Sequence, residues 1–145
     1  MQWKDFLDDT KKLATQIKLD NYQPNILIAV ARGGWMPCRA LSSFLKVKHV
    51  ASYGVKYQDQ NRTRLITYSV PSLPKNVKHI LLVEDQLETG KTLQWVANYY
   101  NNLNYNVKTA AVYLTKKTTW LPDYYVKKVT YDHKMPWEEL PENMI

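Results

Sequence analysis

The stretch HILLVEDQLETGKTLQWV, residues 79–96, decides the fold class because it changes from a strand pattern to a helix pattern. Its apolar run from Ile80 to Val83 is typical of a short buried strand, and it ends in two adjacent acids, Glu84 and Asp85. A polar loop follows, and beyond it apolar residues recur at the spacing of one helix face. A strand, a loop and a helix in this order form the unit from which the parallel sheets of α/β proteins are built.

The rest of the chain repeats this unit. An amphipathic helix is expected over residues 3–17, and Asn21 and Pro24 end it. Further helices are expected at about 37–46 and 91–104, and strands at 26–30, 49–57, 64–70, 79–84, 107–115 and 124–131. We therefore predict a single α/β domain with a mainly parallel, twisted sheet flanked by helices.

The composition is that of a globular protein with one core. The chain has 145 residues, of which 45% are hydrophobic and 23% are charged. No apolar run reaches the roughly 18 to 20 residues that cross a bilayer, the first residues lack a signal-peptide pattern, and Cys38 is the single cysteine. These features predict a cytoplasmic protein without a membrane partner. The net charge of +7 permits nucleic acid as a partner, but it suits a small polyanionic substrate equally well.

Two unusual loops, residues 31–35 and 84–92, follow predicted strands. In parallel sheets, ligands bind beyond the carboxyl ends of the strands. Three of the four glycines, Gly33, Gly34 and Gly90, lie in these loops. Glycine lets the backbone approach a ligand closely, although tight turning alone would also explain its presence. The two loops are the first indication of a binding site.

The second loop has the chemistry of a phosphate site. ETGKT, residues 88–92, opens a helix, whose free N–H groups and dipole attract anions. Thr89 and Thr92 add hydroxyl groups, and Lys91 adds positive charge. The end of the motif resembles a Walker A nucleotide loop, but the first glycine of that loop would fall on Asp85, whose carboxylate would repel a phosphate. We therefore reject the nucleotide-loop interpretation.

Glu84 and Asp85 have a different partner in this interpretation. Two acids close to a phosphate site cannot bind the same phosphate, but they can accept hydrogen bonds from hydroxyl groups beside it. A ribose 5-phosphate offers this combination, and the carboxylates would also favour positive charge that develops on the sugar ring. A solvated turn or a salt bridge is the simpler explanation for two adjacent acids. The buried strand before them and the phosphate loop after them favour the sugar-binding role.

At this point the sequence resembles a known family. LLVEDQLETGKTL, residues 81–93, resembles the phosphoribosyl diphosphate signature of the type I phosphoribosyltransferases. ILIAVARGGWMPCRAL, SYGVKYQDQNRTR, VYLTKKT and LPDYYVKKVTYDHKMPWEE resemble, in turn, the pyrophosphate loop, the mobile loop, a base-reading strand end and the C-terminal hood. The resemblance covers residues 25–139 and is greatest to short microbial xanthine-guanine-hypoxanthine enzymes. It implies one domain over residues 1–145, in which residues 116–145 form a small hood that binds the base.

The resemblance also implies a reaction and a set of site residues. Ribose 5-phosphate would pass from phosphoribosyl diphosphate to a 6-oxopurine, and pyrophosphate would leave. Glu88 would be catalytic, and Mg²⁺ would be held by substrate oxygens with Asp85 or Glu84. The residues implied for phosphoribosyl diphosphate binding are Arg32, Gly33, Glu84, Asp85, Glu88, Thr89, Gly90, Lys91 and Thr92, with Arg62 and Arg64 from the mobile loop. Those implied for base binding are Lys116, Tyr131, Asp132 and His133.

Some features depart from the family or leave alternatives open. Glu88 stands where the family usually has aspartate, and Gln86 and Leu87 replace a small aliphatic pair. Among catalytic alternatives, enzymes for adenine, orotate or uracil remain, although Lys116 favours a 6-oxo acceptor because lysine only donates hydrogen bonds. A nucleotide-sensing regulator of the same fold that binds nucleic acid is the alternative from another class. We expect a homodimer or homotetramer, and nucleic acid is not an expected partner.

Overall fold

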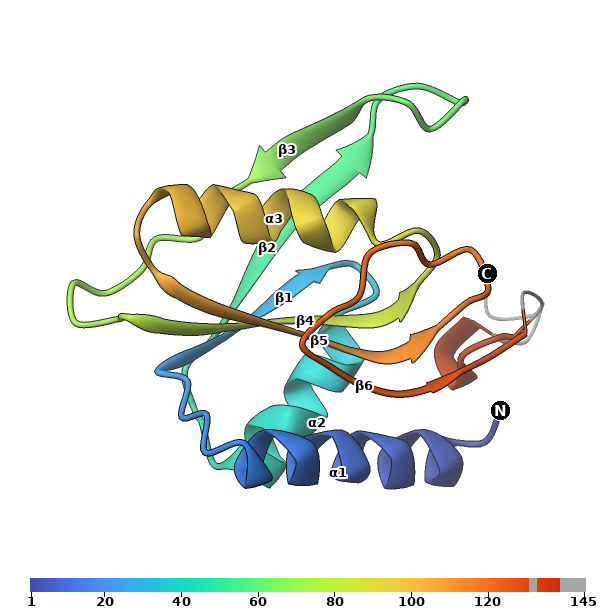
Figure 1. Cartoon of the computed structure of the whole chain (residues 1–145), viewed down its shortest axis with the longest axis horizontal. Coiled ribbons are helices and arrows are strands. Elements are labelled where there is room, and N and C mark those ends of the chain that lie inside the picture. Colours follow the sequence, from blue (N-terminus) through green and yellow to red (C-terminus); the bar gives the residue numbers. More distant parts are fainter. Residues whose placement is uncertain (131–132, 139–145) are drawn as a thin grey trace.

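The computed structural model describes residues 1–130 and 133–138, which form one α/β domain (Figure 1). Its helices are α1 (Trp3–Leu19), α2 (Trp35–Leu45) and α3 (Lys91–Asn102), with a short 3-10 helix at Pro136–Glu138. Its strands are β1 (Ile26–Ala31), β2 (Val50–Tyr57), β3 (Leu65–Ser69), β4 (His79–Leu87), β5 (Asn106–Leu114) and β6 (Tyr124–Lys128). They form one sheet in the order β3-β2-β1-β4-β5-β6, in which β3 is antiparallel to β2 and the other neighbouring strands are parallel. The predicted class is confirmed.

The sheet has a hydrophobic core on each face. In Figure 1, α1 and α2 cover one face and α3 covers the other. Leu27 and Ala29 of β1 pack with the first pair of helices, whereas Ile28 and Val30 pack on the side of α3. Successive side chains of a strand point to opposite faces, so a strand covered on both sides is apolar throughout. β1 and β4 are the two central strands, and their carboxyl ends therefore lie side by side.

Element boundaries differ from the predictions at the place where function was expected. β4 was expected to end at residue 84, but it continues to Leu87 because Gln86 and Leu87 still pair with Tyr113 and Leu114 of β5. Glu84 and Asp85 therefore project from the last residues of a paired strand rather than from a loop. Pairing with β5 fixes the backbone that carries both acids.

β2 and β3 form an arm that extends beyond the rest of the sheet (Figure 1). Thr67 of β3 joins this arm to the core, because its Oγ1 lies 2.8 Å from the Tyr53 hydroxyl and accepts a hydrogen bond from Trp95 Nε1 of α3 at 3.1 Å. At the tip, residues 58–64 close a turn in which Asp59 accepts hydrogen bonds from the backbone N–H groups of Thr63 and Arg64. The arm places its tip above the carboxyl end of β4.

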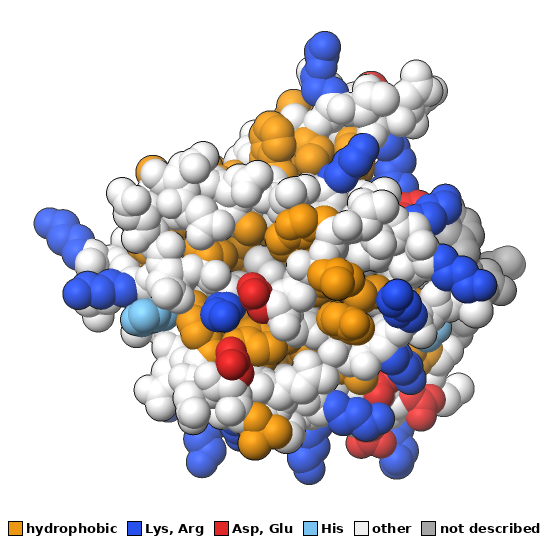
Figure 2. All heavy atoms as spheres, in the orientation of Figure 1, with side chains coloured by type: hydrophobic (Ala, Val, Ile, Leu, Met, Phe, Trp, Pro, Cys, Tyr) orange, Lys and Arg blue, Asp and Glu red, His pale blue; other side chains and the backbone are white. Residues whose placement is uncertain are grey.

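Charge is distributed over the surface of the molecule. Figure 2 shows lysine and arginine side chains mainly toward the edges of one face, at the arm and along α1, with apolar side chains between them. On this face the positive charge is not gathered into one stripe of the kind that follows a nucleic-acid backbone. None of the helices in the described ranges is long and apolar enough to cross a membrane.

Candidate active site

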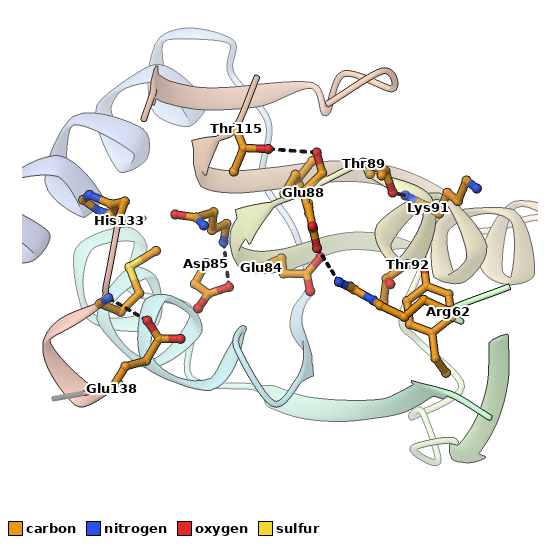
Figure 3. A pocket seen from close by; sticks show the side chains of 15 residues that line it. Arg62, Glu84, Asp85, Glu88, Thr89, Lys91, Thr92, Thr115, His133 and Glu138 are labelled. Carbon is orange, nitrogen blue, oxygen red and sulfur yellow. Dashed lines mark hydrogen bonds and ion pairs between the residues drawn. The ribbon is translucent and has the colours of Figure 1, made fainter. Parts of the chain in front are cut away.

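A pocket of about 400 Å³ opens at the carboxyl end of β4 (Figure 3). Four parts of the chain meet there: β4 with the loop after it, the arm, the end of β5 and the C-terminal segment. The lining residues are Tyr57, Arg62, Glu84, Asp85, Gln86, Leu87, Glu88, Thr89, Gly90, Lys91, Thr92, Thr115, His133, Met135 and Glu138. The position agrees with the rule that ligands bind beyond the carboxyl ends of parallel strands.

Glu84 and Asp85 form the acidic wall of this pocket. Burial, and then the neighbouring Asp85 carboxylate, raise the pKa of Glu84 well above its ordinary value. Burial also raises the pKa of Asp85, to about 6, and the charge of Glu138 adds to this shift. The Gln86 N–H donates a hydrogen bond to Asp85 Oδ1 at 2.6 Å and opposes it. Buried carboxylates with few hydrogen-bond donors around them can accept hydrogen bonds from a ligand or bind a cation.

The loop after β1 packs directly against this wall. A Cβ atom at Gly33 would overlap Asp85 and lie 2.7 Å from its Cγ atom. Glycine is therefore required here for the close approach of the two strand ends. The peptide bond between Ala31 and Arg32, in the same loop, is cis.

The loop after β4 forms the other wall. Gly90 precedes α3 with φ of 94°, a left-handed conformation that favours glycine. Thr89, Lys91 and Thr92 line the pocket around it, and Thr89 Oγ1 accepts a hydrogen bond from the Lys91 N–H at 3.3 Å. An N-terminal helix end with hydroxyl groups and a lysine has the donors that a phosphate group requires.

Glu88 lies between the two walls and carries two cationic partners. Arg62 from the arm donates to Glu88 Oε2 at 2.6 Å (Figure 3), and Lys117 Nζ lies 3.7 Å from Glu88 Oε1. The Arg62 guanidinium also lies over the Tyr57 ring, 5.0 Å from its centroid. These contacts hold the tip of the arm over the pocket.

The pocket brings together most of the predicted site residues. Those that line it are Glu84, Asp85, Glu88, Thr89, Gly90, Lys91, Thr92, Arg62 and His133. Arg32, Gly33, Arg64 and Lys116 are described by the structure but lie outside its lining, although Gly33 adjoins Asp85. Tyr131 and Asp132 lie outside the described residues.

The match to a known family decides how this pocket is classified. Residues 1–143 match the family described as phosphoribosyl transferase domain. The chain belongs to this family. Its predicted membership, made from the motif around the acid pair, is therefore confirmed.

Several phosphoribosyl transferases are similar to this member over most of its length. Xanthine-guanine phosphoribosyltransferase of Cereibacter sphaeroides is 26% identical over 146 residues, which cover 95% of this chain and 85% of that protein. A purine phosphoribosyltransferase structure from Pyrococcus horikoshii has a TM-score of 0.77 and 28% identity, with 97% and 93% of the two chains covered. The xanthine-guanine-hypoxanthine enzyme of Helicobacter pylori has a TM-score of 0.80 at 21% identity, with 88% and 85% covered.

The phosphoribosyl transferase site also contains residues that sequence reasoning did not select. They are Tyr57, Gln86, Leu87, Thr115, Met135 and Glu138 in the pocket lining, with Lys117 against Glu88. Thr115 directly follows β5, beside β4, and its position at the end of the predicted strand 107–115 was a usable signal. Glu138 follows Pro136 and Trp137, which were quoted for the family resemblance. Lys117 adjoins the predicted Lys116. The local path of the backbone decides which of the two lysines faces Glu88.

Proposed function

We propose that this protein transfers ribose 5-phosphate from phosphoribosyl diphosphate to a 6-oxopurine, which gives a nucleoside monophosphate and pyrophosphate. The observation that carries the proposal is the pocket of about 400 Å³ in which the acid pair, Glu88 and the head of α3 meet. A phosphate monoester fits the N–H groups and hydroxyls at the α3 end. Glu84 and Asp85 are then placed to accept hydrogen bonds from the ribose hydroxyls.

The purine would bind between the loop after β5 and the C-terminal segment. We assign residues 116–145 to a base-binding hood, of which β6 and the 3-10 helix are described. Lys116 or its neighbour Lys117 would donate to the 6-oxo group, and His133 of the C-terminal segment lines the pocket. The relatives from Cereibacter sphaeroides and Helicobacter pylori are named for xanthine, guanine or hypoxanthine, which supports guanine, xanthine and hypoxanthine as the bases to test.

Mg²⁺ could bind at the acidic wall with ligands from both the protein and the substrate. The described residues contain no group of three His, Cys, Asp or Glu side chains that could hold a metal by themselves. Mg²⁺ characteristically keeps few protein ligands and binds through one or two carboxylates and substrate phosphates. Asp85 and Glu84 are hard oxygen donors with raised pKa values, which suits them to this role. When bound, the ion would neutralise charge on the leaving diphosphate.

The chain's own residues would divide the remaining work. The acid pair holds the ribose and favours positive charge on its ring. Glu88 orients the base and accepts or returns a proton at N7. Arg62 is within 2.6 Å of Glu88 and, once released from it, can approach the leaving diphosphate. The closed arm excludes water, which would otherwise capture the ribosyl group.

A product assay tests this proposal directly. Purified protein would be incubated with Mg²⁺, phosphoribosyl diphosphate and one of guanine, xanthine, hypoxanthine or adenine, and nucleotide formation would be followed by chromatography. We expect monophosphates from 6-oxopurines and much less from adenine. Absence of any nucleotide, or equal use of adenine, would contradict the assignment. A homodimer or homotetramer is part of the proposal, and light scattering measures it on the same sample.

A further inference from the structure

Three threonines after β5 hold the backbone of the phosphate loop. The Thr115 hydroxyl donates to the Glu88 carbonyl at 3.0 Å, and Thr118 Oγ1 lies 2.9 Å from the carbonyls of both Leu87 and Glu88. The Thr119 N–H donates to the Thr89 carbonyl at 3.1 Å. We call Thr115, Thr118 and Thr119 the threonine clamp. The clamp comes from the loop after β5, whereas the loop that it holds follows β4.

The clamp determines where the N–H groups of the phosphate loop point. In a planar trans peptide, the carbonyl of one residue and the N–H of the next point in opposite directions. Because the carbonyls of residues 87–89 turn toward the clamp, the N–H groups of Glu88, Thr89 and Gly90 turn away from it. Within the described part of the chain, these three N–H groups have no hydrogen-bond acceptor. Glu88, Thr89 and Gly90 line the pocket, so these unused donors lie at its wall.

The hydroxyl groups are suited to this role by their own bonding. Thr115 Oγ1 also accepts a hydrogen bond from the Lys117 N–H at 3.3 Å, so its proton is directed to the Glu88 carbonyl. Thr118 Oγ1 also donates toward this carbonyl, and shares its one proton between it and the Leu87 carbonyl. Rotation of the Glu88 peptide would break both bonds. The same loop packs on Gly90, where an added Cβ would lie 2.8 Å from the Trp120 carbonyl oxygen.

We propose that the Thr118 hydroxyl is a positioning group that turns the N–H groups of the phosphate loop toward the sugar phosphate. The identity of that ligand rests on the proposed function. Thr118 touches neither substrate nor the reacting atoms in this proposal, because it acts through the backbone of Leu87 and Glu88. It also joins the loop that carries Lys116 and Lys117 to the loop that binds phosphate, so base and phosphate binding share one support.

Ribose 5-phosphate is the probe for the test, and calorimetry gives its dissociation constant without any turnover. Thr118→Val keeps the shape and removes the hydroxyl, and we expect it to weaken ribose 5-phosphate binding about tenfold. The KM for phosphoribosyl diphosphate should rise by a similar factor. Thr118→Ser keeps the hydroxyl, and its binding should stay within about twofold of wild type. Thr15→Val is the matched control, because Thr15 makes the same kind of bond, to the Lys11 carbonyl at 3.0 Å, on the distant helix α1.

The outcomes separate the clamp from the rest of the site. Wild-type affinity in a folded Thr118→Val protein overturns the proposal, as does equal weakening by Thr118→Ser, which would show that disturbance of this position, rather than loss of the hydroxyl, weakens binding. If Thr118→Val does not fold, Thr115→Val removes the second bond to the Glu88 carbonyl and is measured in its place. Ribose 5-phosphate binding without nucleotide formation would contradict the proposed function and would still test the clamp. Failure of the wild-type protein to bind ribose 5-phosphate overturns the clamp's role.

Discussion

Asp9 of α1 and Asp85 of β4 are both withdrawn from water, but their surroundings are opposite. Asp9 is buried and accepts hydrogen bonds from the Tyr113 hydroxyl at 2.8 Å and from Lys12 and Lys127 at 3.0 Å. Burial would raise the pKa of Asp9, but these partners outweigh it, and its pKa lies below the ordinary value. The pKa of Asp85 is raised to about 6, because the Gln86 N–H compensates only part of its burial.

The difference separates a structural acid from a functional one. The partners of Asp9 come from α1, β5 and the edge strand β6, so its charge fastens the first helix to the sheet. Ionisation of Asp85 is unfavourable in the free protein, and among the described residues this carboxylate faces a pocket rather than a cationic side chain. A charged ligand or a set of ribose hydroxyls would supply the missing compensation. The acid that weakens the free protein is thus the one placed to bind.

Glu88 differs from both aspartates, because it has two cationic partners and nevertheless lines the pocket. We expect Glu88→Gln to lower kcat by about a hundredfold to ten-thousandfold, the range for loss of a general acid or base. The Kd for phosphoribosyl diphosphate should change much less, since the amide keeps the size of the side chain. Single-turnover kinetics together with equilibrium binding measure the two effects separately. Glu88→Asp, which restores the residue usual in the family, is the control and should retain most of the activity; comparable turnover in the wild type and Glu88→Gln would refute the role.

Asp85→Asn tests the functional side of the comparison. Asparagine can still accept the Gln86 N–H, but it removes the charge that faces the pocket. We expect kcat/KM for phosphoribosyl diphosphate to fall about tenfold to a hundredfold, the loss of one or two hydrogen bonds to a charged group. Steady-state kinetics at saturating Mg²⁺ and base provide the measurement. An unchanged kcat/KM would remove Asp85 from the site.

Asp9→Asn tests the structural side. It should lower the free energy of unfolding by about 2 kcal/mol, because a buried carboxylate with three donors becomes a neutral amide. Urea denaturation at pH 7 measures this change, and kcat/KM of the folded variant should equal that of the wild type. A loss of activity without a loss of stability would show that the two acids do not differ in the way proposed.

The six strands could be predicted from the sequence because the pattern of apolar residues that marks a strand is contained in a few consecutive residues. It predicted Glu84, Asp85 and Glu88 as neighbours because they share one short segment at a strand end. The threonine clamp was missed because it depends on the order of the strands in the sheet. The order β1-β4-β5 brings Thr115 beside Leu87, and this order cannot be inferred from the hydrophobic pattern of either strand alone.

Contacts over long sequence separations were harder to predict. Arg62 was selected for phosphoribosyl diphosphate, but in the structure it pairs with Glu88, 26 positions away. The length and twist of the arm decide where its tip lies, and neither follows from residue pattern. Lys117 rather than Lys116 faces Glu88 for the same kind of reason, since a turn after β5 changes which side chain points inward.

The pH dependence of stability is the smallest and most specific test of the comparison. Burial raises the pKa of Asp85 in the folded protein to about 6, above its ordinary value, so folding favours the protonated form of this carboxyl. The protonated Asp85 side chain therefore contributes to the free energy of unfolding below about pH 4, and this contribution is lost as the pH rises through about 6. The loss amounts to about 1 kcal/mol, since solvent at the pocket mouth reduces the effect of burial. Asp9 has the opposite sign, because its pKa is lowered: its contribution is present above about pH 4 and is lost as the pH falls further.

Urea denaturation of the wild type and both variants between pH 3 and pH 8 would measure these two slopes. Asp85→Asn should remove a decrease in stability between about pH 4 and pH 6, because asparagine does not ionise. The deficit of Asp9→Asn should be constant at neutral pH and should shrink only below about pH 4. Parallel curves for the wild type and Asp85→Asn would mean that the free protein already stabilises the ionised carboxylate of Asp85. The interpretation of this carboxylate as a group that waits for a ligand would then be wrong.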